Sequence, residues 1–393
     1  MLNIKPPNLK AYSRCNFLSL LCKRMIIGFD AKRAFNNRRG LGNYSRSVIR
    51  IMGTLYPDNR YLLYTPKTDP NINFEIPATA KIITPQNVCW RKVSALWRTF
   101  AISKEAARDK VSVFHGLSHE LPVGIERTAV KSVVTMHDLI FLKYPKLYPW
   151  IDRKLYKTKY LHSCRIADTI VAVSEQTKRD LIDLAGVPEE KISVVYQGCD
   201  PLFYVKKSSE EVDLVRKKYS LPSHYILNVG AIEERKNQKL LIEAAACAHI
   251  DMPIVIVGVE TEYASTLQSI IRHHHFERRV IILSGISSNE LSCIYQAASL
   301  FVYPSLFEGF GIPIIEAMAS GVPVIAASGS CLEESGGHGS IYVSPTNSEE
   351  LAVQMECVLG DSNLQERMVS LGTEHLARFS DKSIADALME VYR

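Results

Sequence analysis

The stretch YPSLFEGFGIPIIEAMASGVPVIA, from Tyr303 to Ala326, carries the strongest fold signal in the chain. It begins at the end of an apolar, aromatic run, 299–305, that is typical of a short buried strand. Pro313 suits the first turn of a helix because its missing N–H is not needed there, and Gly321 suits the end of that helix. The apolar run 323–328 predicts a second strand. A strand, a helix and a strand in this order predict a βαβ unit in a parallel sheet.

The loop between the first strand and the helix has the chemistry of a ligand site. Gly309 and Gly311 let the backbone approach a ligand closely, and the free N–H groups at the start of the helix favour a phosphate. Glu308 and Glu316 need a different partner, because carboxylates accept hydrogen bonds from hydroxyls. A sugar nucleotide supplies both a pyrophosphate and hydroxyl groups. The alternative is that the two acids only decorate a helix start, where acids are favourable in any protein.

Strands and helices alternate along the rest of the chain. The predicted strands form two series, separated by a linker rich in Pro, Ser and Lys near 199–222. The first series comprises 25–31, 61–66, 80–85, 111–116, 132–138 and 169–175, and the second comprises 225–231, 253–258, 279–285, 299–305 and 323–328. Helical patterns lie between most of them, as at 44–55, 91–108, 153–167 and 176–185. The sequence therefore predicts an α/β fold with two Rossmann-like, doubly wound parallel-sheet domains that face each other across a cleft.

The predicted domain plan has four parts. Residues 1–24 show no clear period and are expected to form a flexible tail. Residues 25–200 form the first Rossmann-like domain and 201–380 the second, and 381–393 form a last helix that crosses back to the first domain. Because ligands bind beyond the carboxyl ends of parallel strands, residues that follow strands are the first site candidates. These are His115, His137, Ser174, Gly230, Gly285 and Glu308.

Composition narrows the class of protein. The chain has 393 residues, of which 47% are hydrophobic and 22% charged, as in ordinary globular proteins. No apolar run reaches the ~20 residues that a transmembrane helix needs, and the short apolar stretch 16–22 is not followed by the cleavage site of a secretory signal. The nine cysteines are scattered without a C-x-x-C pair, which argues against a zinc site or a disulfide framework. A cytoplasmic location fits best.

Positive charge is concentrated near the N-terminus. Residues 1–50 contain eleven Lys or Arg and a single acid, Asp30, whereas the whole chain has a net charge of +6. Such a surface attracts nucleic acid, anionic lipid or a phosphorylated substrate, or it is a solvated face without a partner. No recognition motif accompanies it, so nucleic acid is not an expected partner. The segment 88–102 mixes large aromatic side chains with cations, which suits either a membrane interface or a helix packed on a sheet.

Five segments together resemble glycosyltransferase family 4, whose members are retaining enzymes with the GT-B fold. They are YPSLFEGFGIPIIEAMASGVPVIA (303–326), YILNVGAIEERKNQKLLIEA (225–244), ILSGISSNELSCIYQAASLFVYPS (282–305), VVTMHDLIFLKYP (133–145) and VAVSEQTKRDLIDLAGVPEEKISVVYQGCD (171–200). The first has the family's two glutamates separated by seven residues. The resemblance covers about residues 25–393, and it implies transfer of a sugar from a nucleotide diphosphate donor to a hydroxyl acceptor.

The resemblance also implies roles for individual residues. Glu308 would hold the transferred sugar and Glu316 the ribose. Arg235 and Lys236 would steady the leaving diphosphate, and His137 would support the transition state. A glycine loop in NNRRGLGNYSRS (36–47) would close over the donor phosphate. The expected donor-binding residues are Gly40, Gly42, Gly230, Arg235, Lys236, Gly285, Glu308, Gly309, Phe310, Gly311 and Glu316, and the expected catalytic residues are His137, Glu308, Arg235 and Lys236.

The chain departs from the family pattern at two positions. Ala231 stands where many members have an arginine, which leaves the phosphate to the later cations Arg235 and Lys236. Glu334 matches a family glutamate near the nucleotide, but Glu333 precedes it in place of the usual proline. No D-x-D motif occurs anywhere in the chain, so we expect neither a metal ion nor another cofactor.

Only the resemblance indicates which sugar donor and which acceptor the protein uses. The ERKN arrangement at 234–237 resembles a subgroup with many mannosyltransferases, which favours mannose from GDP-mannose and leaves UDP sugars open. The expected acceptor is a saccharide or lipid-linked saccharide in O-antigen or capsule synthesis. Arg38 and Arg39 beside the glycine loop would attract such an anionic acceptor, and an anionic membrane surface would be a further partner, with the protein peripheral on the cytoplasmic face. Two alternatives remain: a nucleotide-sugar 2-epimerase of the same fold, which needs no acceptor, and a non-catalytic sugar-nucleotide-binding protein.

Overall fold

The computed structural model describes residues 24–72, 74–145, 150–248 and 250–393, and it contains two parallel sheets. The strands of the first are β1 (Ile26–Asp30), β2 (Arg60–Tyr64), β3 (Ala80–Ile83), β4 (Val113–Gly116), β5 (Lys131–Met136), β6 (Thr169–Ala172) and β7 (Ile192–Val194). Those of the second are β8 (Ile226–Val229), β9 (Ile254–Val257), β10 (Val280–Leu283), β11 (Leu300–Tyr303), β12 (Val324–Ala327) and β13 (Ser340–Val343). Their orders are β3-β2-β1-β4-β5-β6-β7 and β10-β9-β8-β11-β12-β13. The predicted α/β fold with two parallel sheets is confirmed.

By compactness the chain divides into two units. The first contains the residues up to His115 together with Pro122–Ser132, and the second contains Gly116–Leu121 and Val133–Arg393. This division runs inside the seven-stranded sheet. The domain boundary that the sequence places between residues 200 and 201 stays a prediction, and almost all of the tail predicted at 1–24 lies outside the described residues.

The first unit begins with β1, which pairs with β2 from Ile26 opposite Arg60 to Asp30 opposite Tyr64. Its helices are α2 (Lys32–Asn36), α3 (Gly40–Leu55), α4 (Val88–Lys92), α5 (Ser94–Phe100) and α6 (Ile102–Arg108). The single helix predicted at 91–108 is therefore wrong. One break falls at Val93, whose φ of −117° and ψ of 47° leave the helical region, and a β-branched side chain favours such a break because it fits a helix poorly.

A buried ion pair joins β1 to α5 within the first unit. Asp30 is 3% exposed and Arg98 is 8% exposed. The Nη2 atom of Arg98 lies 2.6 Å from Oδ2 of Asp30, and its Nε–H donates to the same oxygen at 2.8 Å. The other carboxylate oxygen accepts the N–H of Lys32 at 3.2 Å. Both charges are therefore removed from water, and each depends on the other to offset the cost of desolvation.

The second unit contains one end of the first sheet, with β6 and β7 and most of β5, and the whole of the second sheet. Helices α7 (Ile140–Lys143) and α8 (Trp150–Ile166) follow β5, and α9 (Glu175–Ala185) follows β6. Ser174 caps α9 because its hydroxyl accepts the N–H of Thr177. Gly186 ends α9 with φ of 64°, the left-handed conformation that glycine adopts without steric cost.

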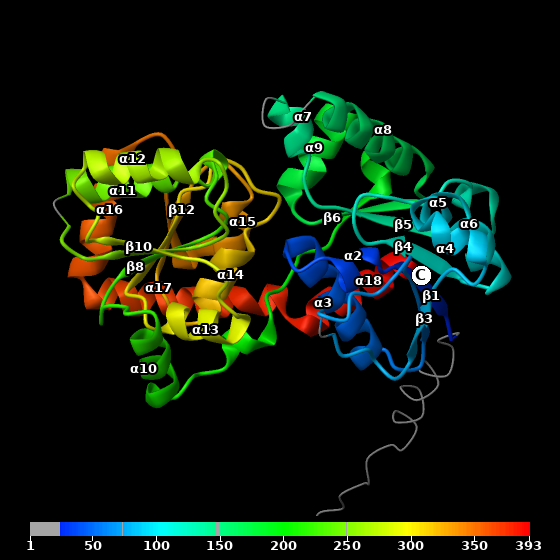
Figure 1. Ribbon diagram of the computed structural model, residues 1–393, viewed down its shortest axis with the longest axis horizontal. Coiled ribbons are helices and arrows are strands. Elements are labelled where there is room, and N and C mark those ends of the chain that lie inside the picture. The colour runs from blue at the N-terminus through cyan, green and yellow to red at the C-terminus, as the bar shows by residue number, and fades with distance from the viewer. Residues whose placement is uncertain (1–23, 73, 146–149, 249) are drawn as a thin grey trace, which may run out of the picture. The chain divides into compact units, whose positions relative to one another are not determined.

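The six-stranded sheet is covered by helices on both faces, as a doubly wound sheet requires (Figure 1). Alternate residues of one strand point to opposite faces, so Ile226 packs with one helical layer and Leu227 with the other. One layer contains α11 (Gln238–Cys247), α12 (Ala264–His273) and α16 (Ser348–Gly360). The other contains α13 (Ser288–Gln296), α14 (Ile312–Ala319) and α15 (Leu332–Gly336).

Several details of the second unit differ from the prediction. Strands β7 and β13 were not predicted, because runs of three and four residues give too short a signal. The predicted linker at 199–222 contains α10 (Ser209–Lys218), which begins with a capping box formed by Ser208 and Glu211. The remaining helices are α17 (Ser362–His375) and α18 (Asp381–Tyr392). The last of these confirms that 381–393 is helical, and its crossing to the first domain stays a prediction. Among the described residues, no helix has the length and hydropathy of a membrane span.

We predict that Asp30→Asn lowers the free energy of unfolding by about 3 kcal/mol, because the buried guanidinium of Arg98 loses this counter-charge. Urea denaturation of the purified protein measures the change. The control is Lys382→Ala, which breaks an exposed pair with Asp386 at 2.7 Å and should change stability by less than about 0.5 kcal/mol. Equal effects of the two substitutions would contradict the interpretation.

Candidate functional site

The site is built where β8 and β11 end side by side. The two strands are paired, with Leu300 opposite Ile226. A 3₁₀ turn after β8, Glu234–Lys236, carries two cations, and the loop after β11 carries Glu308. Neighbouring parallel strands end at the same edge of the sheet, so the turn and the loop meet there. The structure therefore brings together three of the candidate residues, Arg235, Lys236 and Glu308.

The Glu308 carboxylate is held by four side chains. Its Oε1 atom lies 2.6 Å from Nζ of Lys236 and its Oε2 atom 2.9 Å from Nη1 of Arg235. The hydroxyl of Ser305 donates to Oε1 at 2.6 Å and the hydroxyl of Tyr303 donates to it at 3.0 Å. The two hydroxyl donors were not predicted, although both stand in the quoted stretch at the end of a strand, which is the position that marks site residues.

The two cations determine the charge state of Glu308. Burial alone would raise the pKa of this carboxyl, but Lys236 and Arg235 outweigh burial and lower the pKa to about 2. Burial would likewise lower the pKa of Arg235, and the carboxylates of Glu308 and Glu233 instead raise it. At neutral pH the cluster therefore contains an ionised carboxylate and two positive charges in a site with little water.

The Lys236 ammonium can make one more hydrogen bond than the described residues provide. Lys236 has three N–H groups, of which one goes to Glu308 and one to the Tyr303 hydroxyl at 2.7 Å. The third has no partner among the described residues. The aliphatic stem of Lys236 runs past Gly230, where a Cβ would lie 3.4 Å from its Cδ. A Cβ at Gly230 would thus make only ordinary van der Waals contact with the lysine chain. The feature that suits an added anion is the remaining N–H of the ammonium.

The loop after Glu308 depends on two glycines. A Cβ on Gly309 would lie 2.0 Å from the carbonyl oxygen of His137, so only glycine fits. Gly311 has φ of 126°, and a Cβ there would meet the hydroxyl of Ser335 at 2.6 Å. The Phe310 side chain between them is 3% exposed and stacks on Tyr196. Phe310 therefore anchors the loop, and only its backbone can contribute to ligand binding.

Glu316 lies in the second turn of α14, because the helix begins at Ile312 and has Pro313 in its first turn. Its Oε2 atom accepts the hydroxyl of Tyr295 on α13 at 3.0 Å. Burial raises the pKa of Glu316 to about 7, and the Tyr295 hydrogen bond opposes this shift. Glu316 is therefore poised between its neutral and ionised forms near physiological pH, whereas Glu308 is always ionised there.

His137 follows β5 and is held by the segment Gly116–Leu121. Its ring Nε2 lies 3.0 Å from the carbonyl oxygen of Leu117, and its backbone N–H donates to ring Nε2 of His119 at 2.9 Å. Asp138, which the sequence suggested as an orienting group, accepts the N–H of Ile140, and burial raises its pKa. Neither Leu117 nor His119 was predicted, because the only signal is their place in a loop after β4.

The other predicted residues are placed as follows. Gly285 follows β10 with φ of 71°. Gly40 and Gly42 lie at the start of α3 in the first unit, where a Cβ on Gly42 would strike the Asn37 carbonyl at 1.9 Å and a Cβ on Gly40 would meet nothing within 4 Å. Gly42 is thus required by the fold itself. The part of both glycines in donor binding stays a prediction.

Two further candidates have structural partners. His115 is 0% exposed and packs against the Phe29 ring, with 6.1 Å between centroids. It is therefore part of the core of the first unit. The Glu334 carboxylate accepts the N–H groups of Glu175 and Gln176 at 2.6 and 2.9 Å, at the start of α9.

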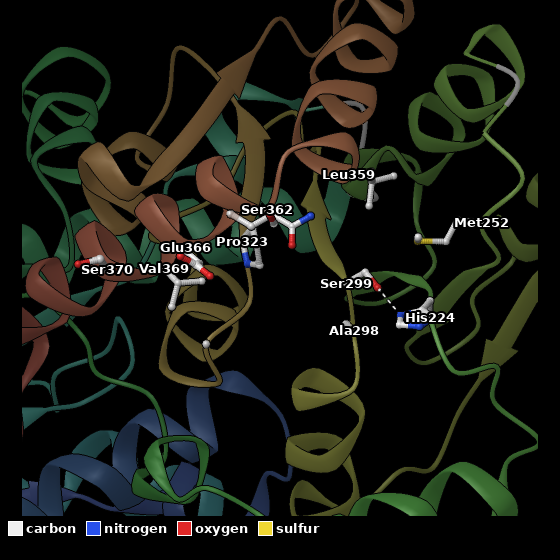
Figure 2. A pocket seen from close by; sticks show the side chains of 12 residues that line it. His224, Met252, Ala298, Ser299, Pro323, Leu359, Ser362, Glu366, Val369 and Ser370 are labelled. Carbon is white, nitrogen blue, oxygen red and sulfur yellow. Dashed lines mark hydrogen bonds between the residues drawn. The ribbon is translucent and has the colours of Figure 1, made fainter.

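Figure 2 shows a cavity in the second unit whose lining includes none of these residues. Its lining includes His224, Met252, Ser299 and Pro323, which stand just before β8, β9, β11 and β12. It therefore opens at the amino ends of the strands, opposite to the edge where Glu308 lies. Since ligands of such sheets bind at the carboxyl ends, we do not assign a donor to this cavity. Among the described residues, no group of His, Cys, Asp or Glu side chains is arranged to hold a metal ion.

The sequence matches two family profiles. Residues 57–202 match Glycosyltransferase Family 4, and residues 213–375 match Glycosyl transferases group 1. Together the two matches cover more than half of the chain. The second contains the whole Glu308 cluster described above.

Relatives and solved structures agree with these matches. The chain is 29% identical over 295 residues to O-antigen chain mannosyltransferase B of Escherichia coli, covering 73% of this chain and 76% of that protein. It is 29% identical over 282 residues to O-antigen chain mannosyltransferase RfbU of Salmonella typhimurium, covering 72% and 73%. A crystal structure of Anabaena HepE with UDP and glucose superposes with a TM-score of 0.73 at 19% identity, covering 94% of this chain and 99% of that one. The chain belongs to glycosyltransferase family 4 and is a glycosyltransferase with the GT-B fold.

Proposed function

We propose that this enzyme is a retaining hexosyltransferase that moves mannose from GDP-mannose to a saccharide or lipid-linked saccharide acceptor in the synthesis of a cell-surface polysaccharide. The observation that carries the proposal is the Glu308 carboxylate between Lys236 and Arg235, next to the glycine loop at the start of α14. Cations and free N–H groups suit a diphosphate, and carboxylates suit sugar hydroxyls. The two O-antigen mannosyltransferases to which the chain is similar support mannose as the sugar.

Each residue of the cluster would have one task. Lys236 and Arg235 would stabilise the negative charge that develops on the diphosphate as the glycosidic bond breaks, which is the usual role of fixed cations in such transfers. Glu308 would accept hydrogen bonds from sugar hydroxyls and keep both cations in place while the site is empty. Glu316 would accept the ribose hydroxyls. His137, whose carbonyl oxygen abuts Gly309, would contact the transferred sugar.

Retention would follow from attack on the face that the diphosphate leaves. A carboxylate nucleophile would have to be free to approach the sugar carbon, but Glu308 is bound by two cations and two hydroxyls. This makes Glu308 a poor nucleophile. The acceptor hydroxyl would instead pass its proton to the departing diphosphate and form the new bond on the same face. This route uses Glu308 only for binding.

Exposed side chains of α4 and α5 support a peripheral position on the cytoplasmic face of an anionic membrane. Val88 is 65% exposed, Leu96 50% and Phe100 52%, and the cations Arg91 and Lys92 are also exposed. Apolar side chains beside cations are typical of segments that rest on an anionic lipid surface. A lipid-linked acceptor would be presented at such a surface.

The proposal is tested by incubating the purified protein with GDP-mannose, UDP-glucose or UDP-galactose, with and without a lipid-linked oligosaccharide acceptor, and analysing the products by mass spectrometry and NMR. We expect transfer from GDP-mannose only, with the α-configuration of the donor kept in the product. Inversion would contradict the mechanism, and transfer from a UDP sugar would contradict the donor. Conversion of the donor to an epimer without an acceptor would instead favour the epimerase.

We predict that GDP-mannose binds more tightly as the pH rises from 6 to 8. The pKa of Glu316 in the free protein is about 7. Its ionised form can accept ribose hydroxyls on both carboxylate oxygens, whereas the protonated form carries a hydrogen on one of them. Binding of GDP-mannose therefore favours loss of the proton. Isothermal titration calorimetry should show an affinity increase of about threefold to tenfold, and proton release near pH 7. In Glu316→Gln, which does not titrate, the affinity should be lower and independent of pH. The same pH dependence in both proteins would contradict this role.

We predict that Lys236→Met lowers kcat by about 10²-fold to 10³-fold, because a fixed charge at the leaving diphosphate is lost. Initial rates with GDP-mannose measure the effect, and a melting curve shows whether the variant is folded. Lys239→Met is the matched control, since Lys239 lies three residues away in an exposed pair with Glu243. Its activity should equal that of the wild type. Similar losses in both variants would rule out a specific role for Lys236.

A further inference from the structure

The segment Gly116–Leu121 is tied to the end of β5 by three hydrogen bonds. The N–H of His119 donates to the carbonyl of Thr135 at 3.0 Å. The ring of His119 accepts the N–H of His137 at 2.9 Å, and the carbonyl of Leu117 accepts from the His137 ring at 3.0 Å. His137 is thus held at its backbone and at its side chain by one short loop.

These contacts determine which ring nitrogens carry protons. A backbone N–H can only donate, so Nε2 of His119 must be without a hydrogen. A carbonyl oxygen can only accept, so Nε2 of His137 must carry one. The His119 ring is therefore in the tautomer that has its hydrogen on Nδ1, and its Nε2 is the acceptor at this contact.

The backbone of His119 is unusual for a residue that has a side chain. Its φ is 63°, in the left-handed region that residues other than glycine rarely adopt. Such a conformation persists only where surrounding contacts impose it, and it gathers at functional sites. Its ring also packs against Tyr160 of α8, with 5.5 Å between centroids, and edge-on against the His137 ring at 5.1 Å.

The held peptide of His137 bears directly on the loop that carries Glu308. The carbonyl oxygen of His137 occupies the space that a Cβ on Gly309 would need. The Thr177 hydroxyl lies 3.3 Å from that oxygen and 3.2 Å from the carbonyl oxygen of Gly309. A shift of the His137 peptide would therefore press on Gly309 or open a gap beside it, and in both cases Glu308, one residue earlier, would move.

We propose that His119 is a positioning residue of this glycosyltransferase: by accepting the N–H of His137 it fixes the peptide against which the Gly309 loop is packed, and so fixes His137 and Glu308 in relation to each other. The effect on catalysis rests on the proposed function, in which both residues contact the transferred sugar. The effect on the two loops does not, so the two can be tested separately.

The test compares wild type with His119→Leu, His119→Gln and Tyr160→Phe. Leu removes the acceptor while filling most of the space, and Gln restores an acceptor oxygen where Nε2 stood. Tyr160→Phe keeps the ring beside His119 and removes a buried hydroxyl for which the described part of the chain offers no hydrogen-bond partner, so it is the matched control. Melting temperatures show that each variant is folded.

Hydrogen–deuterium exchange of the ligand-free proteins is the first measurement. In His119→Leu we expect faster exchange in segments 133–141 and 303–312, with His119→Gln and Tyr160→Phe close to the wild type. Exchange in 303–312 that is the same in His119→Leu as in the wild type would overturn the proposal, whatever the donor is.

Steady-state kinetics with GDP-mannose is the second measurement. Displacement of aligned groups lowers the rate of the chemical step more than it lowers the affinity for the substrate. We therefore expect kcat of His119→Leu to fall about tenfold or more while KM changes less than about twofold. Recovery in His119→Gln would show that the acceptor atom is what matters. If His119→Gln does not restore the kcat that His119→Leu loses, or if Tyr160→Phe loses as much, the proposal is wrong and His119 only contributes to packing. If the wild type does not use GDP-mannose, only the proposed identity of the sugar donor is contradicted. The hydrogen–deuterium exchange result then decides whether His119 positions the two loops.

Discussion

The site depends on one electrostatic arrangement, the Glu308 carboxylate buried between Lys236 and Arg235. None of the three charges would be stable alone at this depth, because desolvation of a single ion costs several kcal/mol. Together with the hydroxyls of Tyr303 and Ser305, the three charges satisfy most of one another's hydrogen-bonding capacity. The cations are therefore held in fixed positions, and fixed charges of this kind are what the proposed stabilisation of a leaving diphosphate requires.

The parallel sheet explains why these groups meet. Strands β8 and β11 are neighbours although about 70 residues separate them, so the turn that carries the cations and the loop that carries Glu308 leave the sheet at the same edge. The two glutamates of the quoted stretch then divide into different chemical states. Glu308, among cations, is ionised with a pKa of about 2, and Glu316, buried beside one hydroxyl, has a pKa of about 7. The environment thus gives two identical side chains different charge states.

Much of this arrangement could be predicted because it has local signals. Apolar runs with turn residues at their ends predicted eleven of the thirteen strands, and the position after a strand marked His137 and Glu308. The contacts that complete the site could not be predicted, since they join residues far apart in sequence. The Tyr295 hydroxyl reaches Glu316 from another helix, and His119 reaches His137 across a loop. Helix breaks such as that at Val93 and the packing of Gly42 on Asn37 likewise depend on tertiary structure.

The central claim is that a nucleotide sugar binds at the carboxyl edge of the six-stranded sheet, between the cation turn and the start of α14. Hydrogen–deuterium exchange of the wild-type protein with and without saturating GDP-mannose tests it most directly. We predict slower exchange in 230–238 and 305–318 and no change in 362–370, which line the cavity at the opposite edge. Protection confined to 362–370, or no protection at 305–318 at a concentration that raises the melting temperature, would contradict the assignment of the site.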